Sequence, residues 1–370
     1  MKIVDNEMKS PRVIAFYLPQ YYPFKENNEW WGMGFTEWTN VGRAKPLFKG
    51  HYQPRVPADL GYYDLRLPEV RIQQATLARE AGVYGFCYWH YWFGNGKRLL
   101  QRVFDEVLES GSPDFPLCLG WANHSWYAKT WDKYSKDRLL IEQTYGNTED
   151  YINHFNYALK AFKDSRYIKV HNKPVFFIYD ALAVPDDFLK LWQRLAQSNG
   201  LPGICFIGRI KNDADYGQAL ERGFSYVSSE RITRIVMSRG ILERRFFQLK
   251  NILLKRPVNC YSYEEAFPYF VNKKMDSLPN YIPSIIPNWD HSPRSQRRGL
   301  ILHNSTPDLF SKHIKEVFSL IKNKPIDEQI VFLKSWNEWG EGNYMEPDLK
   351  WGRKYIDTLR KEIQLYRSSY

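Results

Sequence analysis

Short β-rich runs alternate with amphipathic helical stretches along most of this 370-residue chain, and this alternation constrains the fold more than any other feature. Strand-like runs separated by helical patterns predict parallel βαβ units, and eight of them predict an α/β fold, the (β/α)8 TIM barrel with long βα loops. The expected strands are Val13–Tyr17, Gly85–Trp89, Leu117–Trp121, Val175–Tyr179, Ile204–Gly208, Tyr226–Ser228, Ile282–Ile286 and Ile330–Leu333. The expected helices are Pro68–Ala81, Leu99–Ser110, Thr148–Asp164, Asp186–Asn199, Ala214–Arg222 and Pro307–Asn323.

A doubly wound open sheet is the competing layout. It needs a glycine-rich phosphate turn after an early strand, and the sequence there is Tyr-Leu-Pro-Gln-Tyr-Tyr. No Gly/Ser-rich or Pro-rich linker interrupts the chain, which favours a single catalytic domain over residues 1–370. A basic insertion at about residues 231–280 follows the sixth expected strand.

Composition narrows the class of protein further. Aromatic residues make up 16% of the chain, with 13 Trp and 26 Tyr, and rings with polar tips suit carbohydrate, although large cores and interfaces also use them. Cys87, Cys118, Cys205 and Cys260 stand far apart, without disulfide or metal spacing. The N-terminus has no apolar signal core and no run is long enough to span a membrane, so we expect a cytoplasmic protein, unless a signal was removed.

The segment 331–347 carries the strongest chemical signal. It reads Val-Phe-Leu-Lys-Ser-Trp-Asn-Glu-Trp-Gly-Glu-Gly-Asn-Tyr-Met-Glu-Pro, an apolar run that ends in Glu338 and Glu341 among aromatic residues and glycines. A buried strand that brings paired acids into an aromatic mouth is typical of sugar-cleaving acid/base chemistry. We expect burial and the second carboxylate to raise the pKa of Glu341, leaving Glu338 the more ionised. The alternative is a buried ion pair of one glutamate with Arg209 or Lys334.

The barrel interpretation places functional residues directly after the C-terminal ends of the strands. Nearly every expected strand is followed there by a polar or ionisable group, although loops are polar in any case and Asp180 suits a helix cap. We therefore predict that Glu338 and Glu341 lie at the barrel mouth and that His90, Asn123 and Arg209 open onto the same cavity. The polar residues at these strand ends are Gln20, Tyr21, His90, Tyr91, Asn123, His124, Asp180, Arg209, Glu230, Trp289, Asp290, Asn337 and Glu338.

Other side chains are candidates for contact with a sugar. Glu37 lies in a loop and either binds hydroxyl groups or ties the loop to the backbone. His90 and His124 are too isolated to be metal ligands, so hydrogen bonding is expected and no metal site is predicted. Candidates for stacking, each of which also suits a core, are Trp30, Trp31, Trp38, Trp89, Trp92, Trp126 and Trp131. The predicted substrate-binding residues are Tyr17, Gln20, Tyr21, Glu37, Trp38, His90, Trp92, Asn123, His124, Trp126, Arg209, Glu230, Trp289, Asn337 and Trp339.

Four sequence blocks carry a family resemblance. They read Ala-Phe-Tyr-Leu-Pro-Gln-Tyr-Tyr-Pro, Glu-Trp-Trp-Gly-Met-Gly-Phe-Thr-Glu-Trp-Thr-Asn-Val, Gly-Phe-Cys-Tyr-Trp-His-Tyr-Trp-Phe and Ser-Trp-Asn-Glu-Trp-Gly-Glu-Gly. The chain resembles WbsX-type proteins over nearly its whole length and, more loosely, glycoside hydrolase family 99, the retaining endo-α-mannosidases. The resemblance implies a TIM barrel that acts on mannose-like sugars without a metal or nucleotide cofactor.

The resemblance to family 99 also implies roles for the two acids. The first glutamate of the signature, here Glu338, takes a proton from the sugar 2-hydroxyl, which then attacks the anomeric carbon and forms a 1,2-anhydro intermediate. The second, here Glu341, protonates the leaving oxygen and later activates water. This neighbouring-group route differs from the usual carboxylate nucleophile, so the separation of the carboxylates does not predict the stereochemistry in the usual way.

Three classes of function follow. The leading class is a glycoside hydrolase that cleaves α-mannoside-like linkages of a polysaccharide or surface glycan. The second is a glycosyltransferase in O-antigen or capsular polysaccharide biosynthesis, and the third is a non-catalytic glycan-binding barrel. No nucleotide-sugar site is recognised in the sequence, which counts against a conventional transferase but not against one that uses a lipid-linked donor.

The net charge of +11 is concentrated in part between Arg231 and Arg256, where basic and apolar residues recur at near-helical spacing. This segment is typical of a helix on a membrane surface, and we expect it to contact an anionic membrane peripherally. The alternative is a helix that covers the barrel and turns a basic face to solvent. Nucleic acid is not an expected partner, because no binding module accompanies the charge.

Overall fold

The computed structural model describes residues 10–128 and 138–369. The chain divides into two compact units. The first comprises residues 1–84, 230–277 and 283–370, and the second comprises residues 85–229 and 278–282. The single catalytic domain expected from the sequence stays a prediction.

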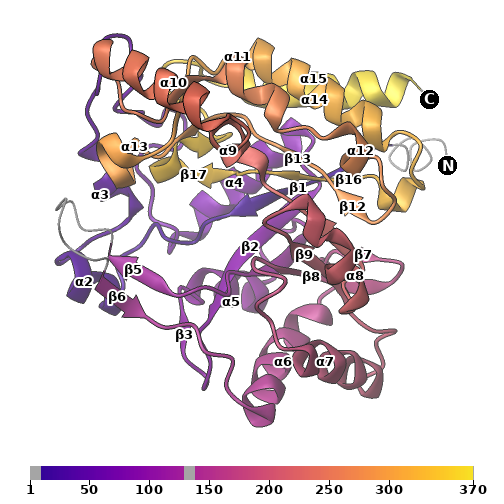
Figure 1. The fold of residues 1–370 in the computed structure, drawn as a ribbon. Coiled ribbons are helices and arrows are strands. Elements are labelled where there is room, and N and C mark those ends of the chain that lie inside the picture. Colours follow the sequence, from indigo (N-terminus) through magenta and orange to yellow (C-terminus); the bar gives the residue numbers. More distant parts are fainter. Residues whose placement is uncertain (1–9, 129–137, 370) are drawn as a thin grey trace. The chain divides into compact units, whose positions relative to one another are not determined.

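Three parallel strands form the core of the first unit. Strand β1 (Arg12–Tyr17) pairs with β16 (Ile330–Leu333), and β16 also pairs with β13 (Ser284–Ile285). All four residues of β16 are buried. Helices α14 (Pro307–Ile321) and α15 (Lys354–Ser368) lie side by side, and α4 (Pro68–Ala81) packs against α15 (Figure 1). The apolar run before the paired acids is therefore a buried strand, as the sequence predicts.

Short elements of the first unit carry the loops around this core. A three-stranded sheet is formed by β11 (Cys260–Ser262), β15 (Ile301–His303) and β14 (Trp289–Asp290), and a hairpin by β17 (Asn337–Glu338) and β18 (Asn343–Tyr344). The remaining helices are α2 (Lys25–Trp31), α3 (Glu37–Gly42), α9 (Arg234–Met237), α10 (Ile241–Leu253), α11 (Tyr263–Ala266), α12 (Lys273–Asp276) and α13 (Ser292–Ser295).

The second unit is built on six parallel strands. Their order is β2 (Gly85–Trp92), β4 (Leu117–Trp121), β8 (Lys173–Ile178), β9 (Cys205–Arg209), β10 (Tyr226–Ser228) and β12 (Tyr281–Ile282). Its helices are α5 (Arg102–Ser110), α6 (Thr148–Phe162), α7 (Asp186–Ser198) and α8 (Tyr216–Glu221). Short antiparallel strands decorate it, namely β3 (Arg98–Leu99), β5 (Trp126–Ala128), β6 (Arg138–Ile141) and β7 (Lys169–Val170).

The parallel strands match the predicted runs to within one or two residues at each end, apart from two larger differences. The run 282–286 is broken into β12 and β13 at Pro283, which has no N–H for a strand ladder, so nine parallel strands replace the expected eight among the described residues. Strand β2 continues to Trp92, so His90 and Tyr91 lie within the strand and not after it. Within the described parts of the chain, no helix is long and apolar enough to cross a membrane.

Candidate active site

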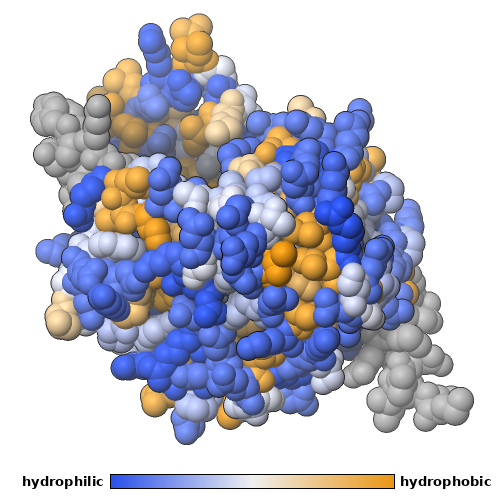
Figure 2. Space-filling model, turned by 90° about the horizontal axis from the view of Figure 1, so that it is seen from below, coloured by the Kyte–Doolittle hydropathy of each residue, from blue (hydrophilic) through white to orange (hydrophobic). Residues whose placement is uncertain are grey.

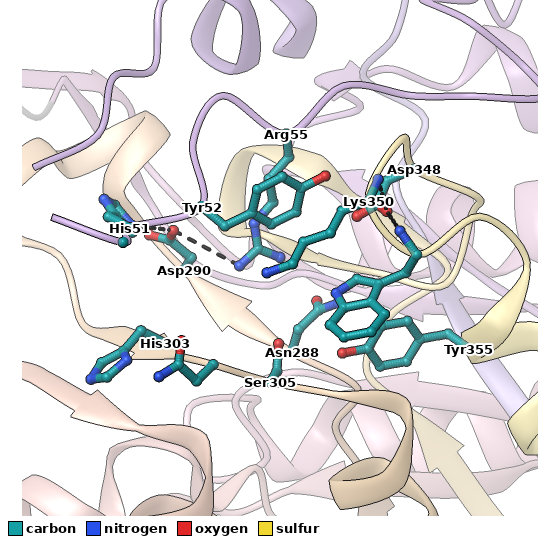
Figure 3. A pocket seen from close by; sticks show the side chains of 13 residues that line it. His51, Tyr52, Arg55, Asn288, Asp290, His303, Ser305, Asp348, Lys350 and Tyr355 are labelled. Carbon is teal, nitrogen blue, oxygen red and sulfur yellow. Dashed lines mark hydrogen bonds and ion pairs between the residues drawn. The ribbon is translucent and has the colours of Figure 1, made fainter. Parts of the chain in front are cut away.

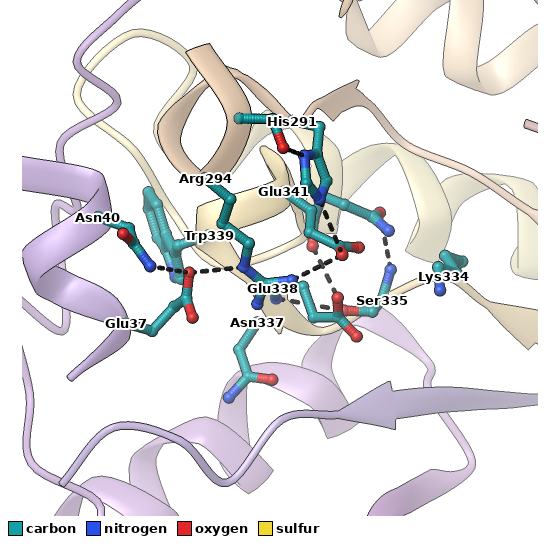
Figure 4. Close-up of polar contacts among 12 residues, drawn as sticks. Glu37, Asn40, His291, Arg294, Lys334, Ser335, Asn337, Glu338, Trp339 and Glu341 are labelled. Carbon is teal, nitrogen blue, oxygen red and sulfur yellow. Dashed lines mark hydrogen bonds and ion pairs between the residues drawn. The ribbon is translucent and has the colours of Figure 1, made fainter. Parts of the chain in front are cut away.

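The two predicted catalytic acids lie on the β17–β18 hairpin of the first unit. Glu338 ends β17 and pairs with Asn343 of β18, and the turn between them runs through a single 3₁₀ turn, Trp339–Glu341. Ser335 holds the base of the hairpin, because its N–H donates to Asn343 Oδ1 (2.9 Å) and its Oγ accepts from the N–H of Glu338 (3.2 Å). Figure 4 shows both carboxyl groups converging with Arg294.

At both glycines of the Trp-Gly-Glu-Gly turn, a side chain would be sterically unfavourable, for a different reason at each position. A Cβ on Gly340 would lie 1.6 Å from Glu37 Oε1, so only glycine lets that carboxylate approach the turn. Gly342 has φ +54°, and a Cβ there would lie 2.7 Å from the Cβ of Asp290. The glycines therefore let Glu37 and Asp290 pack directly against the backbone that carries the acids.

Arg294 of α13 is the cation of the site. Its Nε donates to Glu37 Oε1 (2.8 Å) and its Nη1 donates to Glu341 Oε1 (2.6 Å). Burial lowers the pKa of Arg294, but Glu37 and Glu341 outweigh that and raise it well above its usual value. His291 Nε2 also lies 3.7 Å from Glu341 Oε1. Glu341 is therefore the direct partner of a permanent cation.

Glu338 has the opposite electrostatic environment. Burial first, then the charge of Glu341 and a hydrogen bond with that carboxyl group, raise the pKa of Glu338 to about 7, against the lowering effects of Lys334 and Arg294. The sequence predicts that Glu338 is the more ionised acid, whereas its raised pKa favours the protonated form. Arg294 donates directly to Glu341 and contributes the smallest of the effects on Glu338.

Lys334, Glu230 and Trp289 form the next layer around Glu338. Lys334 Nζ donates to Glu230 Oε1 (3.0 Å) and lies 5.8 Å from the centre of the Trp289 ring. The indole N–H of Trp289 is buried and has no hydrogen-bond partner among the described residues. The carboxylate of Glu230 already has Lys334 as its partner.

Several predicted substrate-binding residues of the first unit support the hairpin instead of lining an opening. Asn337 clamps the backbone of Leu18, with Oδ1 accepting from its N–H (2.7 Å) and Nδ2 donating to its C=O (3.0 Å). The hydroxyl of Tyr21 accepts from the N–H of Trp339 and donates to the C=O of Asn337. Tyr17 donates to Gln74 (2.7 Å). These contacts tie the acid-bearing hairpin to the end of β1.

Trp339 lies on a buried network centred on Glu346. Its ring stacks on Tyr344 with centroids 3.7 Å apart and lies 5.6 Å from the ring of Trp38. Its N–H donates to Glu346 (2.6 Å), which also accepts from Tyr63 (2.9 Å) and Gln74 (2.6 Å). Burial raises the pKa of Glu346 to about 7, although the hydrogen bonds from Trp339, Gln74 and Tyr63 lower it. Trp339 is fully buried, so it packs as core and stacks on no sugar.

A small polar pocket of about 20 Å³ lies beside the turn that carries the acids (Figure 3). Asp290 lies 2.8 Å from His51 and 3.8 Å from Arg55, and although burial raises the pKa of Asp290, these partners hold it at about 2. Arg55 donates to the C=O of Gly342 (2.8 Å), and Asp290 accepts from the N–H of Ser292 at the start of α13 (3.0 Å). The ionised Asp290 thus anchors both the acid turn and the helix that bears Arg294.

The other candidates belong to the second unit, where two are buried in an aromatic cluster. His90 Nε2 and His154 Nε2 lie 2.8 Å apart, and burial and Arg98 lower the pKa of His90 to about 3. Trp92 stacks on His154 with centroids 4.4 Å apart and donates to Asp150 (3.1 Å). His90 and Trp92 are therefore neutral packing residues of that unit.

Four further candidates of the second unit lie at or beyond strand ends. Asn123 is held by Asp180, donating to its C=O (3.0 Å) and accepting from its N–H (2.7 Å). Arg209 stacks on Tyr179, with its guanidinium 3.7 Å from the ring centre. His124 is exposed and Trp126 half-buried. That these residues share a cavity with the glutamates stays a prediction, and Trp131 lies outside the described residues.

An Asp-x-Asp triplet also occurs in the chain. It is Asp213–Asp215, which forms a 3₁₀ turn in which Asp215 accepts from the N–H of Asn212 (3.1 Å), as a cap. The structure adds Arg294, which pairs with Glu341. In the sequence, only the position of Arg294, four residues after Asp290, pointed to a place near the site. Among the described residues no three His, Cys, Asp or Glu side chains are placed to hold a metal.

Comparison with solved structures defines the class of fold. The chain resembles a glycoside hydrolase-like protein (14% identity, TM-score 0.61, covering 96% of this chain and 94% of that chain). It also resembles the GH99 endo-α-mannosidase of Bacteroides thetaiotaomicron in complex with bis-tris-propane (15% identity, TM-score 0.60, covering 97% and 98%). At these identities the likeness concerns the fold, and it confirms the predicted TIM-barrel class.

The family follows from the sequence. A family model described as "Glycosyltransferase WbsX" matches residues 13–359, and the chain belongs to this WbsX family, as the four sequence blocks indicated. Two curated relatives, each called "Uncharacterized protein WxcX" and found in two strains of Xanthomonas campestris pv. campestris, are 32% identical over 374 aligned positions. The alignments cover 95% of this chain and 49% of each relative, so the chain spans about half the length of these relatives.

Proposed function

We propose that this protein is a glycan-active enzyme that cleaves α-mannoside-like linkages of a polysaccharide or surface glycan with retention, through a 1,2-anhydro sugar intermediate. The observation that carries the proposal is the Glu338–Glu341 pair: two hydrogen-bonded carboxyl groups, one with a pKa of about 7 and the other held by Arg294. The WbsX family and the family 99 fold support the substrate class.

The raised pKa of Glu338 supports a pair that shares one proton in the reaction. The hydrogen bond between Glu338 and Glu341 lets that proton pass directly between the two groups. A substrate 2-hydroxyl that donates to Glu338 favours the ionised form of that group, so the proton moves to Glu341. A base with a pKa near 7 is well matched to proton abstraction at neutral pH.

Bond cleavage then follows with both acids in their predicted roles. Glu338 takes the 2-hydroxyl proton as O2 attacks the anomeric carbon, and Glu341 gives its proton to the leaving oxygen. In the second half Glu341 takes a proton from water, the water oxygen attacks the anomeric carbon, and Glu338 returns its proton to O2. Two inversions give net retention, and the pair again carries one proton.

Arg294 and the layer beyond Glu338 set the conditions for these steps. Arg294 stabilises Glu341 each time that group becomes an anion, which happens after it protonates the leaving oxygen. Lys334 favours the ionised form of Glu338, because its charge lowers the pKa of that carboxyl group against the effect of burial. Glu37 serves by orienting Arg294.

A glycosyltransferase is the second candidate, favoured by the description of the family model. The same intermediate would then be opened by a sugar hydroxyl, which Glu341 deprotonates in place of water. Glu338 and Glu341 would have the same roles in both reactions. The two functions differ only in the group that opens the intermediate, which is water in a hydrolase and a sugar hydroxyl in a transferase.

Incubation with α-mannose-containing oligosaccharides in ¹⁸O-labelled water, followed by mass analysis and anomer-resolved NMR, tests the proposal. Hydrolysis adds one ¹⁸O to a new reducing end that first appears as the α-anomer. A glycosylated acceptor without ¹⁸O supports the transferase, and binding without any product supports a non-catalytic glycan-binding barrel. The matched control is Glu362→Gln, which alters a buried carboxylate of α15 outside the site.

A further inference from the structure

Helix α10 turns an apolar row to the outside. Leu242, Phe246, Leu249 and Leu253 follow the i, i+4, i+7, i+11 spacing of one helix face. Their relative exposures are 82%, 70%, 55% and 76%. Single exposed apolar residues are ordinary. The face of the molecule in Figure 2 is mostly hydrophilic, with a few hydrophobic patches. A continuous row on one helix is different, because it marks an interaction surface.

The opposite side of α10 is firmly attached to the first unit. Asn251 is buried and its Nδ2 donates to the carbonyl groups of Val258 (3.2 Å) and Cys260 (3.0 Å). Phe247 stacks on Tyr261 with centroids 4.8 Å apart and packs on the small core around it. The apolar row therefore faces outward because the other face is anchored. Figure 1 shows α10 at the upper edge of the view.

Cations surround this row. Segment 231–256 contains one acid, Glu243, and eight basic residues, Arg231, Arg234, Arg239, Arg244, Arg245, Lys250, Lys255 and Arg256. Arg231 is used internally, in a buried pair with Asp276 (2.7 Å). Arg244, Arg245 and Lys250 are exposed along α10 itself, and Lys255 lies just beyond its end.

We propose that α10 docks this protein onto an anionic lipid bilayer, with the row of Leu242, Phe246, Leu249 and Leu253 inserted between headgroups that pair with the flanking cations. Apolar and basic residues on one exposed helix match the chemistry of such a surface. A second copy of the chain fits less well, because a two-fold contact would bring the same cationic face against itself. The docking does not depend on the proposed reaction.

Vesicle co-sedimentation of the full chain tests this proposal. We expect binding to phosphatidylcholine vesicles that contain phosphatidylglycerol, little binding to phosphatidylcholine alone, and weakening by salt. The variant Arg244→Glu/Arg245→Glu and the variant Leu242→Ser/Phe246→Ser should each bind at least about tenfold less, because cations and apolar insertion both contribute. A matched control is Leu349→Ser/Leu365→Ser, which removes exposed leucines elsewhere in the same unit and should bind like the parent.

The following results would contradict docking of α10 onto an anionic bilayer. No binding at low salt, or equal binding to neutral vesicles, removes the anionic membrane as the occupant. Concentration-dependent dimerisation that Leu242→Ser/Phe246→Ser abolishes, without vesicle binding, assigns the face to a second copy. Thermal unfolding of every variant shows whether lost binding comes from lost folding, which is not expected because the substituted side chains are exposed.

Discussion

Each unit of the molecule buries a hydrogen-bonded pair of titratable groups, and the two pairs differ in their charged neighbours. In the first unit Glu338 meets Glu341, with Arg294 and Lys334 close by, and its pKa is about 7. In the second unit His90 meets His154 among aromatic rings, and burial and Arg98 lower the pKa of His90 to about 3. Burial favours the neutral form of both Glu338 and His90. Near Glu338 the positive charges of Lys334 and Arg294 oppose the effect of burial, whereas near His90 the positive charge of Arg98 adds to it.

The largest effect expected from this difference is on catalysis. Glu338→Gln and Glu341→Gln should each lower turnover by at least about a hundredfold, as removal of a general acid or base does, and leave the fold intact. His154→Gln, which breaks the other pair, should change stability and leave the turnover of folded protein close to that of the parent. Steady-state kinetics on a cleaved substrate measures this. Full activity in either glutamine variant would refute the role of that residue.

Removal of the Arg294 cation should destabilise the fold, because the carboxylates that it contacts would lose their opposite charge. Arg294→Met leaves the buried Glu37 and the partly buried Glu341 without their shared cation, and we expect the free energy of unfolding to fall by about 3 kcal/mol. Urea denaturation measures it. Glu37→Gln added to Arg294→Met should restore part of the loss, because one buried charge disappears. No recovery in the double variant would show that Glu37 is not the group left uncompensated.

The pH dependence of stability should have opposite signs for the two pairs. The pKa of Glu338 is raised from 4.5 to about 7 in the folded protein, so the folded state binds the extra proton and stability falls as pH rises from about 4.5 to 7. Glu338→Gln should therefore be more stable than the parent at pH 8, by up to about 3 kcal/mol, with the difference vanishing near pH 4. Thermal unfolding across pH tests it. A variant less stable than the parent at pH 8 would contradict this assignment.

The histidine pair should have the smaller effect. The pKa of His90 is lowered from 6.5 to about 3, so the unfolded chain binds more protons and stability falls as pH drops below 6.5. His90→Gln should flatten this loss between pH 6.5 and 5, by about 1 to 2 kcal/mol. Above pH 7 the variant should show no such pH-dependent difference. If the parent and His90→Gln changed in stability by the same amount between pH 6.5 and 5, His90 would titrate normally.

Much of the fold was predictable because strand and helix periodicity are local. Runs such as Leu117–Trp121 and Ile330–Leu333 are strands with the predicted bounds, since continuous apolar stretches of that length suit buried parallel strands. The break at Pro283 could be foreseen from the missing N–H, but not the pairing of the two halves with different strands. The extension of β2 to Trp92 also escaped, because aromatic residues suit a strand and a loop alike.

The site was predictable only where chemistry lies in adjacent residues. The Glu-Trp-Gly-Glu spacing predicts both acids, but the raised pKa of Glu338 depends on its burial and on Glu341, Lys334 and Arg294. The pairing of Arg294 with Glu341 is a tertiary contact without a sequence pattern. Asn337 was expected to touch substrate and instead clamps Leu18. A polar residue at a strand end is equally suited to bind substrate or to hold a neighbouring backbone segment. Only the hydrogen-bond partner seen in the structure distinguishes the two roles.

The contact between Gly340 and Glu37 ties together two positions far apart in the sequence. A methyl group at 340 would occupy the space of Glu37 Oε1, so alanine at 340 requires a shorter side chain at 37, and Arg294 then loses one of its two carboxylates. In an alignment of relatives, positions 37 and 340 should therefore covary. A lineage that changes the turn must first give up Glu37, so the order in which substitutions accumulate is constrained as well as their identity.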